Sequence, residues 1–349
     1  MKFSSRWSVA ALVVLASLVA AAAATAGPAV HRASIQACVL LPDTKSSARY
    51  ELFDRPYLQK AFKAAGVAAT VVNAQNDPQK QRSQADDCTA NGAKVVLLDA
   101  LDPASGAAIT NAVVSAGAKV IDYDRLVPKS KASYYVSFDN VKVGKLQGKG
   151  LAAALKGKKG AVVAELNGGI TDNNAKLFKQ GYDSVLNPLY KKGTLKKASA
   201  GDQWTDWDPV KGQSIFEQML ARNGNHIDGV LSANDGLAGA VVATLKAKGL
   251  KPIPVTGQDA TPTGVQYILA GWQTGTVYKS VKKEAAAAAQ AAIALLKGKK
   301  VATNGKVSGT PSILLTPVWI TKHNYKLLFA DGFVKKSQVC VGTYKQYCK

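Results

Sequence analysis

The stretch Lys119-Val120-Ile121-Asp122-Tyr123-Asp124-Arg125 passes directly from apolar residues to a pair of opposite charges. Its apolar part is typical of a buried strand in a parallel sheet. Asp124 and Arg125 then stand at the carboxyl edge of that strand, where open α/β sheets bind their ligands. A carboxylate supplies acceptors and a guanidinium supplies donors, so the pair suits a ligand with neighbouring hydroxyl groups, such as a sugar, better than a phosphate. The alternative is a local ion pair that ends the strand.

Strands and helices alternate along the chain on either side of this stretch. In the first half, apolar runs predict strands at 35–41, 68–72, 95–98 and 119–123, with helices at 54–65, 78–91 and 104–116. In the second half, we predict strands at 161–166, 195–198, 229–232 and 254–257, and helices at 143–155, 173–188, 210–222, 237–248, 263–270 and 282–296. This rhythm is typical of parallel sheets covered by helices on both faces. A chain of 349 residues is long enough for two such α/β units, and we expect it to cross between them more than once.

The net charge of the chain is strongly positive, at +22. A large positive charge raises the question of nucleic-acid binding. Here the basic residues are mostly lysines in turns and at helix ends, as in Lys156-Gly157-Lys158-Lys159 and Lys297-Gly298-Lys299-Lys300, and no arginine-rich or aromatic-interleaved basic run stands out. We therefore interpret these lysines as solvated surface residues and expect no nucleic-acid partner.

The N-terminus has the pattern of a secretory signal peptide. Lys2 and Arg6 precede an uncharged stretch at 9–26, rich in Ala, Val and Leu, which ends in Ala24-Thr25-Ala26-Gly27. A positive start, an apolar run and small residues at the cleavage site favour export, with residues 1–26 removed. The alternative is a retained membrane anchor, because the stretch approaches the length of a membrane-spanning helix. We predict an exported protein of the periplasm or cell envelope.

Export permits disulfides, and the chain has four cysteines, for which three connectivities are possible. The simplest pairing joins Cys340 to Cys348 in a short local loop and leaves Cys38 with Cys88, so that 336–349 forms a disulfide-closed tail. Metal binding is the rival interpretation of these cysteines, but the spacing of metal ligands is missing from the sequence. The histidines are isolated from one another, at His31, His226 and His323. We expect no metal and no other cofactor.

Several longer blocks of sequence carry a family resemblance. They are Tyr123-Asp124-Arg125, Tyr135-Val136-Ser137-Phe138-Asp139-Asn140, Asp172-Asn173-Asn174-Ala175-Lys176-Leu177-Phe178, Gly201-Asp202-Gln203-Trp204, Asn234-Asp235, Gly257-Gln258-Asp259-Ala260, Thr276-Val277-Tyr278-Lys279 and Leu314-Leu315-Thr316-Pro317. With these blocks, in order over nearly the whole mature chain, the sequence resembles the periplasmic sugar-binding proteins of ABC importers. It is similar to those with the type I, ribose- and galactose-binding-like fold, and among them most closely to the D-xylose binders.

The resemblance implies two doubly wound, Rossmann-like α/β lobes joined by a three-strand hinge. The N-terminal lobe would comprise residues 34–138 plus 280–313, and the C-terminal lobe residues 139–279 plus 314–335. The sugar would lie in the cleft between the lobes. By block matching, its contacts would be Arg49, Tyr50, Asp124, Arg125, Asn174, Trp207, Asn234, Asp259 and Lys279.

The function that the resemblance implies is the capture of a monosaccharide and its delivery to an ABC permease. Because the blocks are most similar to those of the D-xylose binders, the implied monosaccharide is D-xylose. Such a protein is a monomer that meets the membrane surface only through the permease, and it is not an enzyme. Three features depart from the D-xylose binders: Tyr50 stands where they carry a tryptophan, the loop at 43–50 differs in length and composition, and the segment 204–209 is one residue shorter. Another aldose, feeding a sensor or chemoreceptor, is therefore an alternative.

Some of these residues also have a plainer interpretation. Asn234 stands where it would cap the next helix, Trp207 suits core packing, and Lys279 by itself suits the solvent. For the whole site, the alternative is an exported carbohydrate enzyme with Asp124 and Asp259 as acid and base. We disfavour it because the neighbouring basic side chains are expected to keep both carboxylates ionised, which is the wrong state for a general acid.

Overall fold

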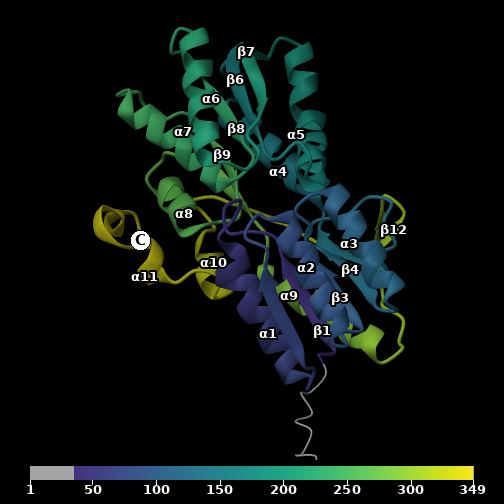
Figure 1. Ribbon diagram of the computed structural model, residues 1–349. Coiled ribbons are helices and arrows are strands. Elements are labelled where there is room, and N and C mark those ends of the chain that lie inside the picture. The colour runs from purple at the N-terminus through teal and green to yellow at the C-terminus, as the bar shows by residue number, and fades with distance from the viewer. Residues whose placement is uncertain (1–34, 349) are drawn as a thin grey trace, which may run out of the picture. The chain divides into compact units, whose positions relative to one another are not determined.

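The computed structural model of the protein describes residues 35–348, and these residues fold into two α/β lobes (Figure 1). The predicted signal peptide at 1–26 and His31 lie outside the described residues. Each lobe has parallel strands with helices packed beside them. The α/β fold class predicted from the alternation of strands and helices is therefore confirmed.

The N-terminal lobe is built on a seven-stranded sheet. Its strands, in spatial order, are β11 (Gly305–Val307), β12 (Thr310–Leu315), β5 (Tyr134–Phe138), β4 (Lys119–Tyr123), β3 (Val95–Leu98), β1 (Ala37–Leu41) and β2 (Ala69–Asn73). All neighbouring strands run parallel except β11 and β12. The strand that precedes Asp124 and Arg125 thus lies in the middle of a parallel sheet.

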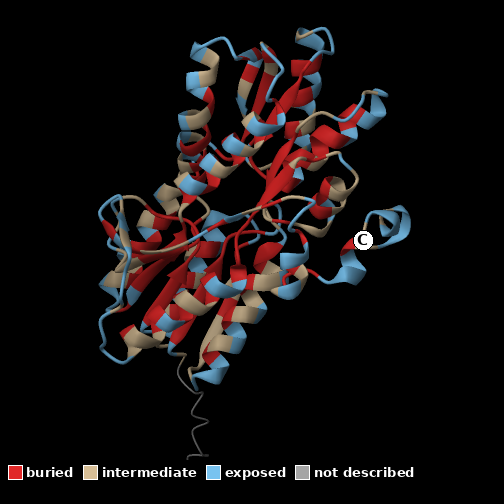
Figure 2. Cartoon of the chain, turned by 180° about the vertical axis from the view of Figure 1, so that it is seen from behind, coloured by how far each residue is buried: buried red, intermediate tan, exposed pale blue. Residues whose placement is uncertain are grey.

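Helices cover both faces of this sheet. They are α1 (Arg55–Ala64), α2 (Pro78–Ala90), α3 (Pro103–Ser115) and α9 (Val281–Leu296). Val39 and Leu41 of β1 pack in one cluster with residues of α1 and α9, whereas Leu40 packs with residues of α2 and α3. Successive side chains of a strand point to opposite faces, so a fully apolar strand is what a sheet between two helical layers requires. In Figure 2 the strands are buried, and the exposed residues lie on the outer sides of the helices.

The C-terminal lobe contains two three-stranded sheets. One has the order β7 (Leu195–Trp204), β6 (Ala161–Asn167), β8 (Gly229–Ser232), and the other the order β13 (Val318–Ile320), β10 (Gly275–Tyr278), β9 (Thr256–Gln258). A parallel bridge between Val230 and Val255 connects them. The helices of this lobe are α4 (Asn140–Ala154), α5 (Asn173–Lys191), α6 (Pro209–Arg222), α7 (Asp235–Ala247) and α8 (Pro262–Leu269).

Helices α4 and α5 approach each other closely at two glycines. A Cβ atom on Gly144 would lie 1.9 Å from the backbone oxygen of Phe178, and one on Gly181 would lie 2.2 Å from that of Val141. Atoms cannot come this close, so only glycine permits the contact. The close packing fixes the position of α5, whose first turn faces the interlobe cavity.

The chain passes between the lobes three times, after β5, after β10 and after β12. Sequence patterns did not predict the strands β5, β10, β11, β12 and β13, nor a π-helix, η1, at Tyr50–Asp54. After β13 come α10 (Lys326–Ala330), α11 (Lys336–Val339) and a 3₁₀-helix, η2 (Gly342–Tyr347). Phe333 from this last segment packs against Phe53 of η1 and Tyr278 of β10, with ring centroids 4.5 and 4.9 Å apart.

Both disulfides have the simplest connectivity that the sequence offered, Cys38–Cys88 and Cys340–Cys348. The first joins β1 to α2 within the N-terminal lobe, and the second closes the C-terminal tail. Within residues 35–348, no group of three or more His, Cys, Asp or Glu side chains is arranged to hold a metal ion.

We expect the two disulfides to stabilise the fold unequally. Cys38 and Cys88 are 50 positions apart, whereas Cys340 and Cys348 are 8 apart. A cross-link restricts the unfolded chain more when the loop is longer, which amounts to about 4 kcal/mol for the first pair and about 2.5 kcal/mol for the second. Replacing Cys38 and Cys88 with alanine should therefore lower the urea midpoint more than replacing the other pair. Equal midpoints, or the reverse order, would contradict this expectation.

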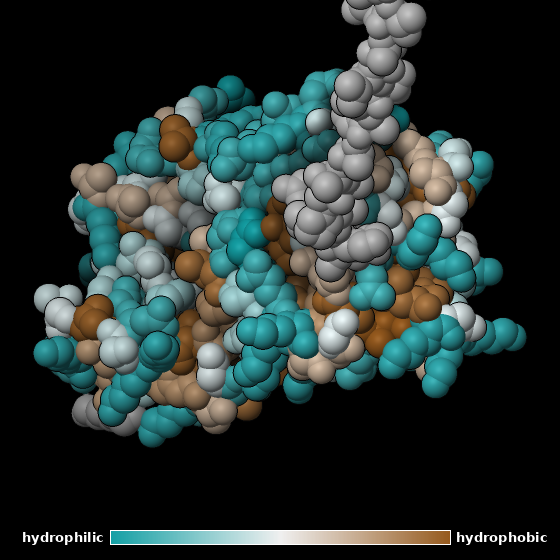
Figure 3. All heavy atoms as spheres, turned by 60° about the horizontal axis from the view of Figure 1, so that its bottom comes forward, coloured by the Kyte–Doolittle hydropathy of each residue, from teal (hydrophilic) through white to brown (hydrophobic). Residues whose placement is uncertain are grey.

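On the face that Figure 3 shows, hydrophilic residues are spread widely and hydrophobic ones form small separate areas between them. None of the helices within 35–348 combines the length and hydrophobicity of a membrane-spanning helix.

Candidate functional site

The predicted ligand residues all line one cavity, which has a volume of about 340 Å³ with open solvent included. Asp124, Asn234 and Asp259 each lie just beyond the carboxyl end of a parallel strand. The strand-end rule therefore placed these three side chains correctly, whereas their role in binding is a proposal below.

Asp124 is held in an uncommon backbone conformation. Its φ is 57°, in the left-handed region that non-glycine residues seldom adopt. Its carbonyl oxygen accepts hydrogen bonds from Tyr135 Oη, Ser137 Oγ and Asn174 Nδ2, at 2.9, 2.9 and 2.8 Å. Backbone strain of this kind persists only where surrounding contacts enforce it. These contacts turn the carboxylate of Asp124 towards the cavity instead of along the strand.

Arg49 anchors the carboxylate of Asp124 from behind. Its guanidinium lies 3.3 Å from Asp124 Oδ1, donates twice to Asp54 at 3.0 and 2.7 Å, and donates to Glu284 at 2.7 Å. Tyr50 Oη donates to the other Asp124 oxygen at 3.1 Å. Arg49 is only 5% exposed, so this is a buried charge network. Its three carboxylates come from three separate parts of the chain.

The charges in this network set the protonation states. Burial by itself would raise the pKa of Asp124, but Arg49, Lys279 and Arg125 outweigh burial and lower the pKa below its usual value. Burial raises the pKa of Glu284 to about 8. The positive charge of Arg49 opposes this rise, whereas the negative charge of Asp124 contributes to it. At neutral pH Asp124 is therefore an ionised acceptor, whereas Glu284 keeps its proton.

The raised pKa of Glu284 predicts a specific pH dependence of stability. Its value moves from 4.5 to about 8 on folding, so the unfolded chain releases a proton that the folded protein retains. This carboxyl therefore makes the fold less stable as pH rises through that interval. Glu284→Gln removes the penalty and keeps an oxygen acceptor for Arg49. The urea midpoint of the variant minus that of wild type should thus be larger at pH 8 than at pH 5. A difference between the two midpoints that does not depend on pH would contradict this.

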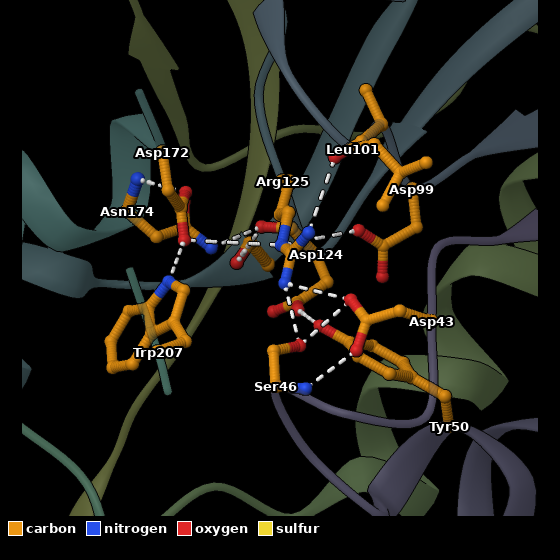
Figure 4. Close-up of polar contacts among 12 residues, drawn as sticks. Asp43, Ser46, Tyr50, Asp99, Leu101, Asp124, Arg125, Asp172, Asn174 and Trp207 are labelled. Atoms are coloured by element: carbon orange, nitrogen blue, oxygen red, sulfur yellow. Dashed lines mark hydrogen bonds and ion pairs between the residues drawn. The ribbon is translucent and has the colours of Figure 1, made fainter. Parts of the chain in front are cut away.

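Arg125 lies among three carboxylates without hydrogen bonding to any of them. Its nitrogens lie 3.7 Å from Asp43, 3.7 Å from Asp99 and 3.8 Å from Asp172 (Figure 4). It donates hydrogen bonds to Ser46 Oγ at 3.0 Å and to the backbone oxygen of Ala100 at 3.4 Å. A guanidinium has more N–H groups than these bonds use. Arg125 therefore has donors to spare for a ligand in the cavity.

Asp99 is a residue that the sequence reasoning missed. It is fully buried, and neither of its carboxylate oxygens has a hydrogen-bond partner within the described residues. Burial, assisted by the nearby charge of Asp124, raises its pKa well above the usual value. Asp99 directly follows β3. The same strand-end rule that singled out Asp124 would have found it.

The C-terminal lobe contributes donors and acceptors to the opposite wall. Asn234 is the N-cap of α7, with Oδ1 accepting from the Leu237 amide at 2.9 Å, and it also lines the cavity. The N-cap interpretation of Asn234 is thus confirmed, whereas its contact with a sugar stays a prediction. Lys279 is 6% exposed and lies 3.4 Å from Asp259. The plainer expectation of a solvated lysine is wrong, because the end of β10 carries it into the cavity wall.

Trp207 lies against the backbone of the loop after β6. A Cβ atom on Gly168 would come within 2.2 Å of its ring, so glycine is what allows the indole to lie there. Its indole nitrogen donates to Asp172 Oδ2 at 3.0 Å, and its ring meets Phe178 edge-on. Core packing and cavity lining therefore both apply to Trp207. Further lining residues that were not predicted are Ser46, Ser47, Asp172, Phe178 and Gln258.

Comparison with known proteins points to one family. The family model described as "Periplasmic binding protein domain" matches residues 38–300. The chain is 36% identical over 296 residues to a D-xylose-binding periplasmic protein of Escherichia coli K12, covering 82% of this chain and 87% of that protein. It is 36% identical over 321 residues to the multiple sugar-binding periplasmic receptor ChvE of Rhizobium radiobacter, covering 85% and 90%. A carbohydrate transporter solute-binding protein from Chloroflexus aurantiacus, solved with D-glucose, is similar with a TM-score of 0.81 and 29% identity, covering 86% and 97%.

Proposed function

Because the chain belongs to the periplasmic binding protein family, we propose that it captures a monosaccharide in the interlobe cavity, D-xylose in the first place, and delivers it to an ABC permease. The observation that carries the proposal is that all the sugar contacts implied by the family resemblance line one cavity. Arg49, Tyr50, Asp124 and Arg125 enter it from the N-terminal lobe. Asn174, Trp207, Asn234, Asp259 and Lys279 enter it from the C-terminal lobe or the crossing strands.

The charges of the cavity favour a neutral ligand that is rich in hydroxyl groups. Its lining has Asp124, Asp172 and Asp259 as acids and Arg49, Arg125 and Lys279 as bases, so the formal charges cancel. Hydroxyl groups both donate and accept, and they can therefore bridge such neighbouring acids and bases. A phosphate or carboxylate ligand would leave the acids unmatched.

The side chains that line the cavity come from both lobes, so a bound sugar would favour closure of the lobes around it. Arg125 comes from the N-terminal lobe, whereas Asp172 and Trp207 come from the C-terminal lobe. A sugar that touches both sets of residues stabilises the closed arrangement of the lobes, because those contacts exist only when the lobes are together. The permease then distinguishes the closed, loaded protein from the open one.

The ionisation of the site argues against the enzyme alternative. Asp124 has a lowered pKa and cannot serve as a general acid at neutral pH. Asp99 and Glu284, whose pKa values are raised, do not line the cavity. We therefore propose binding and release of the sugar without chemical change.

The remaining features of the proposal come from the sequence. We propose the lobe boundaries 34–138 plus 280–313 and 139–279 plus 314–335, cleavage of a signal peptide after residue 26, and a monomer in the periplasm or cell envelope. The relatives named above are described as periplasmic, which supports the compartment.

The decisive test is a thermal-shift screen of the mature protein against pentoses and hexoses, followed by calorimetry. A ligand that binds only the folded state raises Tm with the logarithm of its excess over Kd. We expect D-xylose to give the largest shift and D-glucose a smaller one, because its extra hydroxymethyl group needs additional space. A larger shift with another aldose would show that D-xylose is not the preferred sugar, but it would still support the binding of a monosaccharide. No shift with any monosaccharide would refute the proposed function.

A further inference from the structure

A second hollow adjoins the sugar cavity on its exposed side. We call it the outer chamber, and the residues that line it without lining the sugar cavity include Asn76, Leu101, Thr171, Asp206, Asp208 and Lys211. It encloses about 890 Å³, open solvent included. Most of these side chains are exposed, whereas the lining of the sugar cavity is largely buried. The outer chamber therefore lies between the sugar cavity and the solvent.

Four residues line both spaces and form the boundary between them: Ser46 and Arg125 from the N-terminal lobe, and Asp172 and Trp207 from the C-terminal lobe. Figure 4 shows them side by side. Hydrogen bonds join Arg125 to Ser46 at 3.0 Å and Trp207 to Asp172 at 3.0 Å. Across the middle, however, Arg125 Nε and Asp172 Oδ2 are 3.8 Å apart, too far for a hydrogen bond. The boundary is thus weakest where the two lobes meet.

The chemistry of the outer chamber resembles that of the sugar cavity. Its charged residues are largely matched, since Lys45 lies 2.8 Å from Asp208 and Lys211 lies 2.5 Å from Asp206. The indole of Trp207 reaches into both spaces and offers an apolar surface to each. Matched polar groups around an aromatic ring suit another neutral, hydroxyl-rich unit.

We propose that the outer chamber binds a second sugar unit, so that the protein accepts short oligosaccharides or glycosides whose terminal sugar occupies the inner cavity. This inference rests on the proposed monosaccharide function. Arg125 Nε and Asp172 Oδ2 are 3.8 Å apart, which leaves no room for other atoms, so these two side chains would move apart to let the glycosidic link pass between them. The link would then take hydrogen bonds from the spare donors of the guanidinium. The outer unit would lie along Trp207.

The ion pair at the rim of the outer chamber does not oppose such a ligand. Lys45 is 60% exposed and Asp208 26% exposed. An exposed ion pair contributes little to stability, so a ligand that separates the two side chains loses little. We expect a second unit, with one further hydrogen bond or stacking contact, to bind about ten-fold more tightly than the monosaccharide.

The test compares D-xylose with xylobiose by titration calorimetry on the mature wild-type protein and two variants. Thr171→Trp fills the outer chamber from an exposed loop position. Thr303→Trp makes the same change at an exposed position that lines neither space. In wild type and Thr303→Trp, xylobiose should bind about ten-fold more tightly than xylose. In Thr171→Trp, the Kd of xylobiose should rise at least ten-fold, and that of xylose should change less than about three-fold.

The outcomes separate this inference from the function on which it rests. If wild type binds xylose but not xylobiose, or if Thr171→Trp weakens both sugars equally, the outer subsite is refuted and the monosaccharide function stands. If wild type binds xylobiose but not xylose, the outer subsite is supported and the proposed monosaccharide is wrong. If neither sugar binds, and no other monosaccharide does, both proposals fall.

Discussion

Arg125→Lys should weaken sugar binding by about ten-fold to several hundred-fold while leaving the fold intact. Lysine keeps a positive charge among the surrounding carboxylates but lacks the planar fork of donors. A hydrogen bond to a charged group contributes roughly 1.5–3 kcal/mol, and each such loss changes Kd by about ten-fold or more. Calorimetry with D-xylose measures the loss, and thermal unfolding without sugar checks the fold.

Two further variants sharpen this prediction. Arg125→Ala should lose at least as much affinity and should also lower Tm without ligand, because Asp99 and Asp172 then lose their counter-charge. Asp259→Asn keeps the shape of the side chain but removes the partner of Lys279, so it too should weaken binding. If xylose bound to Arg125→Lys and Asp259→Asn as it does to wild type, the assignment of the cavity would be wrong.

Arg49→Met should cost about 3–5 kcal/mol of folding free energy, the expected loss when one member of a buried ion network is removed. Asp54 and Glu284 are both 0% exposed, and Asp124 is nearly as buried. Without the guanidinium, these buried carboxyl groups lose the donor that they share, and the charge that remains in the network is left buried and unpaired. Sugar binding should fall as well, since Arg49 and Tyr50 orient Asp124.

The matched control is Arg82→Met. Arg82 lies 3.1 Å from Asp86, one turn further along α2, and both side chains are exposed. Such a pair contributes only about 0–1 kcal/mol, so this variant should unfold at nearly the wild-type urea concentration. A loss from Arg49→Met no larger than that from Arg82→Met would show that the buried network does not stabilise the fold.

Much of the candidate site was predictable because parallel strands end at a common edge. Asp124, Asn234 and Asp259 were placed by that rule and by the family resemblance together, and all three line the cavity. Asp99 obeys the same rule after β3 but lies behind Arg125, outside the matched blocks. Phe178 stood within a matched block, yet nothing in its position on α5 distinguished a cavity residue from a core residue.

Local patterns in the chain were sufficient for the α/β class, for the positions of most strands and helices, and for the Cys340–Cys348 disulfide, which left Cys38 to pair with Cys88. Hydrophobic alternation and short spacings between residues can be read directly from neighbouring positions in the sequence. Only the folded structure showed which charged side chains are buried and which of them are paired. Arg49 and Glu284 form a hydrogen bond although they are 235 positions apart in the sequence. Lys279 is buried because β10 ends at the cavity. The strength of a charge–charge contact depends on distance and on the surrounding dielectric, and both are set by packing between segments remote in sequence.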